Sequence, residues 1–189
     1  MIRIRTREPA DVKLCVGVLA QVHQTSGYPT NWPADPPSWL TPSGTVEAWV
    51  ASSDEVAVAG HVLLRQLPAS PLGQPVAEVS RLFVAPAARR QGVAQALLQQ
   101  TLHWATANDQ DLVLEVTDNL QPAQALYEQA GFNRSATNQA DWTTPAGHPV
   151  TLYKYSWNQS RPTHRSRPTD SSRSGRGGHA GGSGGRPPD

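Results

Sequence analysis

The sequence is poor in cysteine and has no long apolar run, and each shortage excludes a class of protein. Cys15 is the single cysteine among 189 residues, which excludes an internal disulfide framework and a cysteine-based zinc site. No stretch approaches the roughly eighteen consecutive apolar residues of a membrane-spanning helix. The N-terminus alternates apolar and basic residues, unlike the apolar core of a secretory signal. These absences predict a soluble, cytoplasmic protein with no membrane partner, and the dispersed histidines predict no metal site.

Only 16% of the residues are charged, and the two signs are unevenly distributed. Residues 158–189 hold six Arg, two Asp and one hydrophobic residue, Ala180, whereas residues 1–157 hold ten basic and thirteen acidic residues. The Arg/Gly/Ser/Pro-rich composition of 158–189 predicts a disordered tail, and 1–157 is long enough to bury the core of one domain. A mildly acidic body argues against a surface built to bind the phosphates of nucleic acid, so nucleic acid is not expected as a partner except through the tail.

Apolar periodicity and turn residues predict a mixed α/β fold in which helices flank a central β-sheet. Residues 27–44 contain five prolines and are predicted to be irregular. Trp32 and Trp39 lie among them, so this segment is expected to pack over another part of the molecule. In chain order, the predicted strands are 2–5, 45–51, 56–65, 78–84, 112–116, 132–135 and 150–157, the predicted helices are 9–24, 92–107 and 122–129, and 136–149 is a predicted loop.

Two common nucleotide-binding patterns are missing from the sequence. Another segment, residues 89–94, predicts an anion site of a different kind. The chain contains neither GxxxxGK[ST] nor GxGxxG, which argues against a P-loop and a dinucleotide-binding fold. It does contain Arg-Arg-Gln-Gly-Val-Ala at 89–94, between a predicted strand and the helix that begins near Gly92. A helix N-terminus offers unpaired N–H groups and the positive end of the helix dipole. With the charges of Arg89 and Arg90, this segment predicts a site for a pyrophosphate-sized anion.

The same segment resembles a signature of a known family. Arg89-x-x-Gly92-x-Ala94 is similar to the (Q/R)-x-x-G-x-(G/A) pattern of the GNAT superfamily, the acyl-CoA-dependent N-acetyltransferases. The strand Glu-Val-Ser-Arg-Leu-Phe-Val at 78–84 resembles the fourth strand of that family, and the segment 122–132, with Leu-Tyr-Glu and a closing Gly-Phe, resembles its final helix. The resemblance covers about residues 2–157. It implies a GNAT-like fold whose fourth and fifth strands splay apart at a bulge to admit the cofactor.

The resemblance also implies acetyl-CoA as the co-substrate and a set of residues that bind it. The pantetheine arm would lie along β-strand residues and pair with them as an added strand, and the pyrophosphate would lie on backbone N–H groups of the helix N-terminus. The family's asparagine contact falls on Leu120, so Asn119 reaches the pantetheine only if the loop slips by one residue. The implied binding residues are Leu82, Phe83, Val84, Arg89, Arg90, Gln91, Gly92, Val93, Ala94, Gln95 and Asn119.

Direct acetyl transfer to a primary amine requires a base and an acid. An alkylamine, with a pKa near ~10, is protonated at neutral pH and must lose a proton before it attacks. The thiolate leaving group benefits from an incoming proton. The resemblance implies Tyr127 as the general acid and Glu78 as the base, acting directly or through water. The alternatives are a packed helix tyrosine and a solvated strand glutamate; His61 is a weaker candidate base.

Two other functions fit the same residues. One is a non-catalytic acyl-CoA-binding domain, against which Tyr127 argues. The other is a nucleic-acid-associated protein that acts through its basic tail, against which the acidic body argues. The sequence leaves open whether the acceptor is a small molecule or a peptide amine, and whether the protein forms a homodimer.

Overall fold

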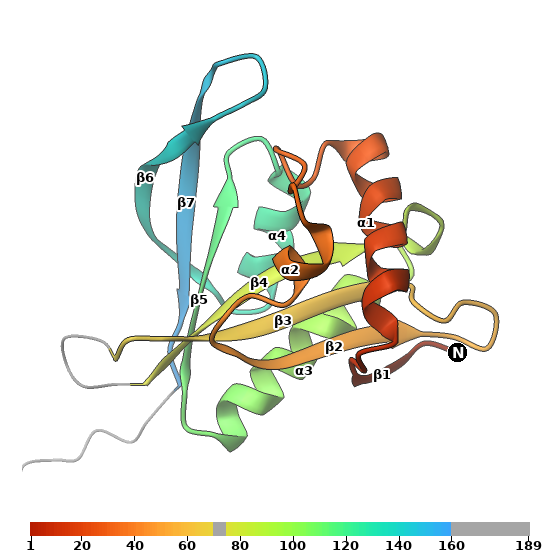
Figure 1. Ribbon diagram of the computed structural model, residues 1–189. Helices are drawn as coiled ribbons and strands as arrows, with labels where there is room; N and C mark the ends of the chain where they lie inside the picture. The colour runs from red at the N-terminus through yellow and green to blue at the C-terminus, as the bar shows by residue number, and fades with distance from the viewer. Residues whose placement is uncertain (70–74, 160–189) are drawn as a thin grey trace, which may run out of the picture.

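The computed structural model describes residues 1–69 and 75–159, so residues 160–189 of the predicted tail lie outside the described residues. The described chain forms a seven-stranded mixed sheet in the order β1-β2-β3-β4-β5-β7-β6 (Figure 1). In chain order the elements are β1 (Arg3–Thr6), α1 (Asp11–Ser26), α2 (Pro36–Leu40), β2 (Thr45–Ser52), β3 (Gly60–Leu67), β4 (Val76–Val84), a 3₁₀ turn (Pro86–Ala88), α3 (Val93–Ala107), β5 (Asp111–Thr117), α4 (Gln121–Gln129), β6 (Asn133–Thr143) and β7 (Pro149–Trp157).

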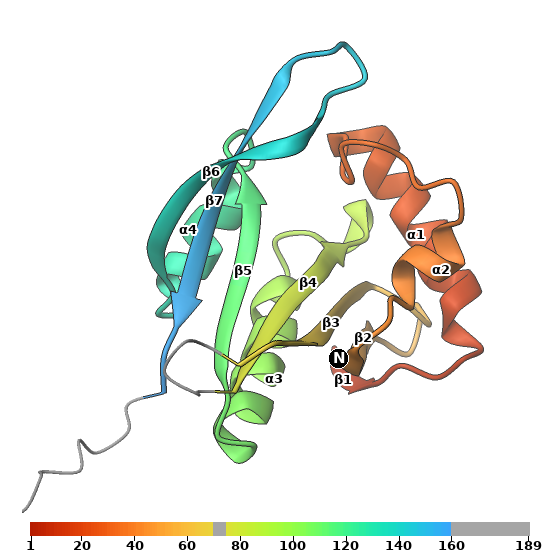
Figure 2. The same cartoon turned by 60° about the vertical axis from the view of Figure 1, so that its left-hand side comes forward.

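Helices cover both faces of this sheet, which confirms the predicted mixed α/β class. Helices α1 and α2 lie on one face, and α3 and α4 lie on the other (Figure 2). The core under α1 contains Cys15, Leu19 and Phe83, and the larger core under α3 contains Leu97 and Leu112. Cys15 is fully buried there, and its burial raises the pKa of the thiol to about 11. No helix in the described ranges is long and apolar enough to cross a membrane.

A β-bulge interrupts β4 and changes the direction of its side chains. Opposite β3, His61 pairs with Phe83 and Leu63 pairs with Ser80, so β4 has one residue more than its partner in this interval. The positive φ of Arg81, 53°, marks this bulge, because non-glycine residues are uncommon in the left-handed region. The bulge therefore shifts the in-and-out alternation by one residue from Leu82 onward.

Strands β4 and β5 are joined by a short parallel seam and then diverge. Their register covers only Val76–Glu78 of β4, opposite residues 111–113 of β5. Beyond Glu78, β4 continues to Val84 while β5 turns away from it (Figure 2). The splayed fourth and fifth strands expected from the sequence are confirmed. On the edge that faces the gap, the far half of β4 has no paired strand among the described residues, while its other edge pairs with β3.

Three predicted segments were wrong in detail. The predicted irregular segment 27–44 contains the short helix α2, which begins with Pro36 after Asp35, whose side chain accepts a hydrogen bond from the Ser38 N–H. Strand β3 begins at Gly60 rather than residue 56. Strand β6 extends to Thr143 through most of the predicted loop 136–149. It is an edge strand with mostly exposed residues, so it lacks the apolar alternation from which strands are recognised.

Candidate active site

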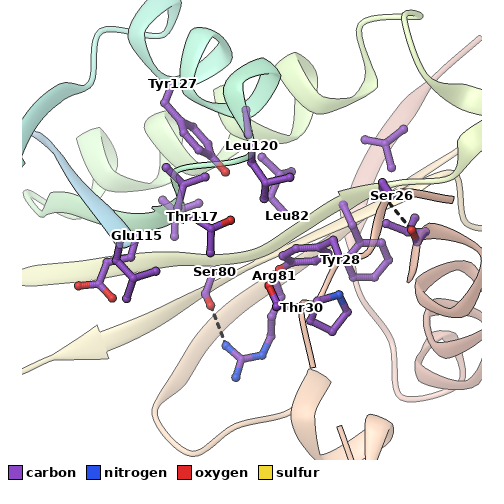
Figure 3. Close-up of a pocket in the computed structure, with 18 of the residues that line it drawn as sticks. Ser26, Tyr28, Thr30, Ser80, Arg81, Leu82, Glu115, Thr117, Leu120 and Tyr127 are labelled. Carbon is purple, nitrogen blue, oxygen red and sulfur yellow. Dashed lines mark hydrogen bonds between the residues drawn. The ribbon is translucent and has the colours of Figure 1, made fainter. Parts of the chain in front are cut away.

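The gap between β4 and β5 opens into a cavity of about 540 Å³. Figure 3 shows walls from the segment after α1, from both splayed strands and from α4. Helix α2 and the β6–β7 hairpin contribute further lining residues. Tyr28 and Trp39 form part of one wall, so the proline-rich segment does pack over another part of the molecule. Of the predicted site residues, the cavity is lined by Glu78, Leu82, Phe83, Val84, Arg89 and Tyr127.

A second cavity of about 450 Å³ adjoins the first, beside the N-terminus of α3. The two cavities share Val84 and Arg89, and α4 residues such as Pro122 and Leu126 form the opposite wall of the second. The predicted anion-site residues that line it are Arg89, Arg90, Gly92, Val93, Ala94 and Gln95. The fold thus joins the predicted phosphate site to the cavity that contains Tyr127.

The backbone before α3 presents N–H groups to the second cavity. Arg90 and Gly92 both have left-handed conformations, with φ of 62° and 77°. The Ala96 N–H donates to the Gly92 carbonyl at 2.9 Å, so the N–H groups of residues 93–95 precede the first such bond of the helix and have no partner within it. A Cβ at Gly92 would meet no atom within 4 Å. Glycine therefore serves the backbone angle at this position and not a lack of space. The angle directs these N–H donors to where an anion is able to bind.

Two predicted binding side chains, Gln91 and Asn119, point away from the cavities, and a third, Arg89, lines both cavities while it is bonded to α1. The Gln91 amide donates to the Ala87 carbonyl at 3.0 Å and lines neither cavity. Asn119 is exposed, accepts a hydrogen bond from the Thr117 hydroxyl at 2.7 Å and also lines neither cavity, whereas Leu120 lines the larger one. The Arg89 guanidinium donates to the Ser26 hydroxyl at 3.1 Å, which directs it toward the end of α1.

Tyr127 projects from α4 toward the splay. Its side chain is 8% exposed, and its ring packs against Phe132 and Tyr155 with centroids 6.1 and 6.2 Å away. The hydroxyl points into the cavity between β4 and β5 (Figure 3). Burial raises the pKa of Tyr127 above that of an ordinary phenol. The hydroxyl therefore stays protonated at neutral pH and is able to donate a proton or a hydrogen bond.

Two carboxylates line the same cavity. Arg65 donates to Oε2 of Glu78 from both Nε and Nη2, at 2.9 and 2.7 Å. These bonds fix the carboxylate of Glu78 and leave its Oε1 without a partner among the described side chains. Glu115 lies on β5, and its side chain is exposed. Sequence reasoning missed Glu115, although the spacing of Glu115 and Thr117 places both on the same face of the strand.

Arg81 is the second residue that sequence reasoning missed. Its guanidinium carbon lies 4.6 Å from the centroid of the Trp39 ring. Its Nε donates to the Trp39 carbonyl, and its Nη1 donates to the Ser80 hydroxyl at 2.7 Å. Burial lowers the pKa of Arg81. The available signal was an arginine directly before the apolar run Leu82–Val84 of the same strand.

His61 supports this bulge from the opposite side. It is fully buried, with Nδ1 at 3.0 Å from the Arg81 carbonyl and Nε2 at 2.9 Å from Nη1 of Arg7. A guanidinium only donates, so Nε2 accepts and the protonated Nδ1 donates to Arg81. Both ring nitrogens are thus occupied, which argues against His61 as a base.

We expect His61 to make the folded state sensitive to mild acid. Desolvation lowers the pKa of His61 to about 3, whereas an unfolded histidine titrates near ~6.5. The unfolded state therefore takes up a proton first, and stability falls between these two pKa values, by about 2 kcal/mol at pH 5. Urea unfolding from pH 7.5 to 5 measures this slope. His61→Gln is expected to flatten it, whereas replacing the exposed His103 by Gln is not; an equal slope in all three proteins would contradict the assignment.

Comparisons with known proteins agree with this geometry. The model of the "Acetyltransferase (GNAT) family" matches residues 20–132. Among solved structures, the ribosomal-protein-S18-alanine N-acetyltransferase from Escherichia coli has a TM-score of 0.69 at 18% identity, covering 87% of this chain and 98% of that one. Arabidopsis thaliana NAA60 in complex with acetyl-CoA has a TM-score of 0.66 at 17% identity, and the match covers 84% of this chain and 100% of that one. A GCN5-related N-acetyltransferase from Kribbella flavida has a TM-score of 0.64 at 24% identity, and the match covers 84% of this chain and 98% of that one.

Proposed function

The chain belongs to the GNAT acetyltransferase family, and from this premise we propose that it transfers the acetyl group of acetyl-CoA to a primary amine. The observation that carries the proposal is the junction of the two cavities. An anion site at a helix N-terminus adjoins a splayed strand pair, and the protonated hydroxyl of Tyr127 projects into the space between those strands. A donor thioester and an acceptor amine can therefore meet beside one proton donor.

The described residues fit acetyl-CoA in two respects. The unpaired N–H groups of residues 93–95 suit the pyrophosphate, and Arg89 and Arg90 add positive charge beside them. The gap beside residues 82–84 suits the pantetheine, whose amides can pair with the exposed strand edge of β4. In the described ranges, no cluster of three or more His, Cys, Asp or Glu side chains could hold a metal ion.

The proposed reaction removes two protons from the acceptor ammonium and supplies one proton to the departing sulfur. Glu78, fixed by Arg65, accepts a proton from the acceptor ammonium through its other oxygen, directly or through water. The amine nitrogen then bonds to the thioester carbon, the carbon–sulfur bond breaks, and the nitrogen releases its second proton to solvent as the amide forms. The hydroxyl of Tyr127 protonates the departing thiolate, and the resulting phenolate regains its proton from solvent. The products are an N-acetylated amine and CoA with a free thiol.

An acceptor screen that reports free CoA thiol tests the proposed function. Acetyl-CoA binding is measured in parallel by calorimetry. Binding with turnover of at least one amine is the expected result. Binding without turnover of any amine, peptides included, would favour a non-catalytic acyl-CoA-binding domain, and absence of binding would refute the assignment of both cavities.

Gly92→Val is expected to weaken acetyl-CoA binding by at least about tenfold. Any side chain at a φ of 77° costs about 1–2 kcal/mol, and relaxing this strain moves the N–H donors of residues 93–95. Gly147→Val is the matched control, because Gly147 also has a positive φ, 81°, and open space around its Cβ position, but lines neither cavity. Calorimetry is expected to show weaker binding only for Gly92→Val; equal affinity in the two variants would contradict the phosphate site.

A further inference from the structure

The larger cavity contains a cation that the proposed reaction does not use. Four charged side chains line this cavity: Glu78, Arg81, Arg89 and Glu115. Glu78 is paired with Arg65, and Arg89 is bonded to hydroxyls at the end of α1. Arg81 differs from these because it is half-buried and no carboxylate of the described residues lies within ion-pair distance of it.

The guanidinium of Arg81 has hydrogen-bonding capacity to spare. Of its five N–H donors, Nε is used by the Trp39 carbonyl and one donor of Nη1 by the Ser80 hydroxyl. The remaining three have no partner among the described residues. A partly desolvated charge that forms no ion pair is unfavourable, and Glu78 acts on Arg81 only from beyond ion-pair distance, so the arrangement favours an anion brought by a ligand.

The guanidinium is also held in one orientation before any ligand arrives. Trp39 lies against its face, the bulge fixes its backbone, and His61 binds its carbonyl. A rigid guanidinium presents parallel N–H donors that match the two oxygens of a carboxylate. Such pre-organisation is typical of a recognition site.

The remaining walls indicate the size and charge of the ligand. The cavity volume of about 540 Å³ falls within the ~300–1,000 Å³ typical of small-molecule sites. The Asn31 amide donates to the Thr143 carbonyl at 3.0 Å, which ties the segment after α1 to the β6–β7 hairpin across two walls of the cavity. Glu115 lies on the β5 side of the cavity. A molecule with one cationic and one anionic group therefore finds a carboxylate, Glu115, and a guanidinium, Arg81, in the same cavity.

We infer that the acceptor is an amino acid whose carboxylate is bound by Arg81 while its amine faces the site of acetyl transfer. This inference rests on the proposed function and narrows its acceptor to one class. Tyr28, Trp39 and Trp142 line the cavity as well, and they suit an apolar side chain on that amino acid.

The test compares each of the standard L-amino acids with its own amide. The amide keeps the amine and the side chain but lacks the carboxylate. It also makes the amine less basic, which favours the amide in the reaction and so works against the expected result. With the full chain and acetyl-CoA, the best amino acid is expected to exceed its amide in kcat/KM by at least about thirtyfold.

Arg81→Gln and Arg81→Lys then assign the preference to the guanidinium. Arg81→Gln is expected to raise the KM for the amino acid about a hundredfold, to leave turnover of the amide within about threefold and to leave the KM for acetyl-CoA unchanged. Arg81→Lys keeps the charge but not the paired donors, so its KM for the amino acid is expected to lie between those of wild type and Arg81→Gln. If the role of Arg81 were purely structural, the kinetic constants for both acceptors and for acetyl-CoA would change together.

The outcomes separate this inference from the proposed function. Equal turnover of amino acids and amides, turnover of peptides alone, or a carboxylate preference that survives in Arg81→Gln would overturn the inference and leave the acetyltransferase intact. If acetyl-CoA binds but no amine reacts, calorimetry on the CoA-loaded protein compares N-acetyl amino acids with their amides. Tighter binding of the acids, lost in Arg81→Gln, would support the inference, and equal or absent binding would overturn it.

Discussion

Tyr127→Phe is expected to lower kcat about 10²–10⁴-fold, the usual range for the loss of a general acid, and to leave acetyl-CoA binding unchanged. The substitution removes one hydroxyl and keeps the ring that packs against Phe132 and Tyr155. The effect belongs in kcat because the lost interaction develops only as charge builds on the sulfur. Since burial raises the pKa of Tyr127 above the ordinary ~10 of a phenol, wild-type activity is expected to persist to at least pH ~10.

Tyr155→Phe is the matched control for this experiment. Tyr155 is also buried and touches the ring of Tyr127, but its hydroxyl donates to Glu128 at 2.9 Å and does not line the cavity. Its kcat is expected to stay within about threefold of wild type. If Tyr127→Phe keeps more than about a third of wild-type turnover, the proton comes from water or another group and Tyr127 serves only packing.

Glu78→Gln is expected to lower kcat about 10²–10⁴-fold near neutral pH, because most acceptor amine is protonated there and the variant has no base. The deficit is expected to shrink as the pH approaches the pKa of the amine, since an unprotonated amine needs no base. A role of Glu78 limited to its ion pair with Arg65 would give a deficit independent of pH. Steady-state rates between pH 6.5 and 10 measure this dependence.

Glu115→Gln provides the comparison, because Glu115 lines the same cavity but is exposed and not held by Arg65. The expected change is in the KM for the acceptor, with kcat retained. The reverse pattern, a pH-dependent loss of kcat in Glu115→Gln and little loss in Glu78→Gln, would transfer the role of base to Glu115.

Local sequence predicted the parts of the site that depend on local backbone structure. The helix N-terminus at Gly92 follows from a glycine and an apolar periodicity that lie within a few residues of each other, whereas Tyr127 was implied by the family resemblance. The splay of β4 and β5 came from the family resemblance. The helix N-terminus could be predicted from the residues themselves because a helix start determines where its own N–H groups point.

Other parts of the site depend on contacts between distant segments and could not be read from the sequence. Arg81 enters the cavity because an extra residue in β4 is matched against β3, and Trp39 reaches it from a segment 42 residues away. Glu115 contributes because β5 turns away from β4. Asn119 differs from these residues because a local contact decides its position: the hydrogen bond from the Thr117 hydroxyl holds its side chain, which lines neither cavity.

The short seam between β4 and β5 has a thermodynamic consequence. Strands β1–β4 and β5–β7 meet through a register that begins at Val76 and ends at Glu78, so the backbone ladder that joins the two halves of the sheet is brief. A molecule bound in the gap would touch both halves and would act as the strand that is missing between them. Because it binds only when both halves are folded, it raises the free energy of unfolding by mass action, about 2.7 kcal/mol at a hundred times its Kd. Substrate supply would thereby raise the equilibrium stability of the fold as well as the rate of turnover.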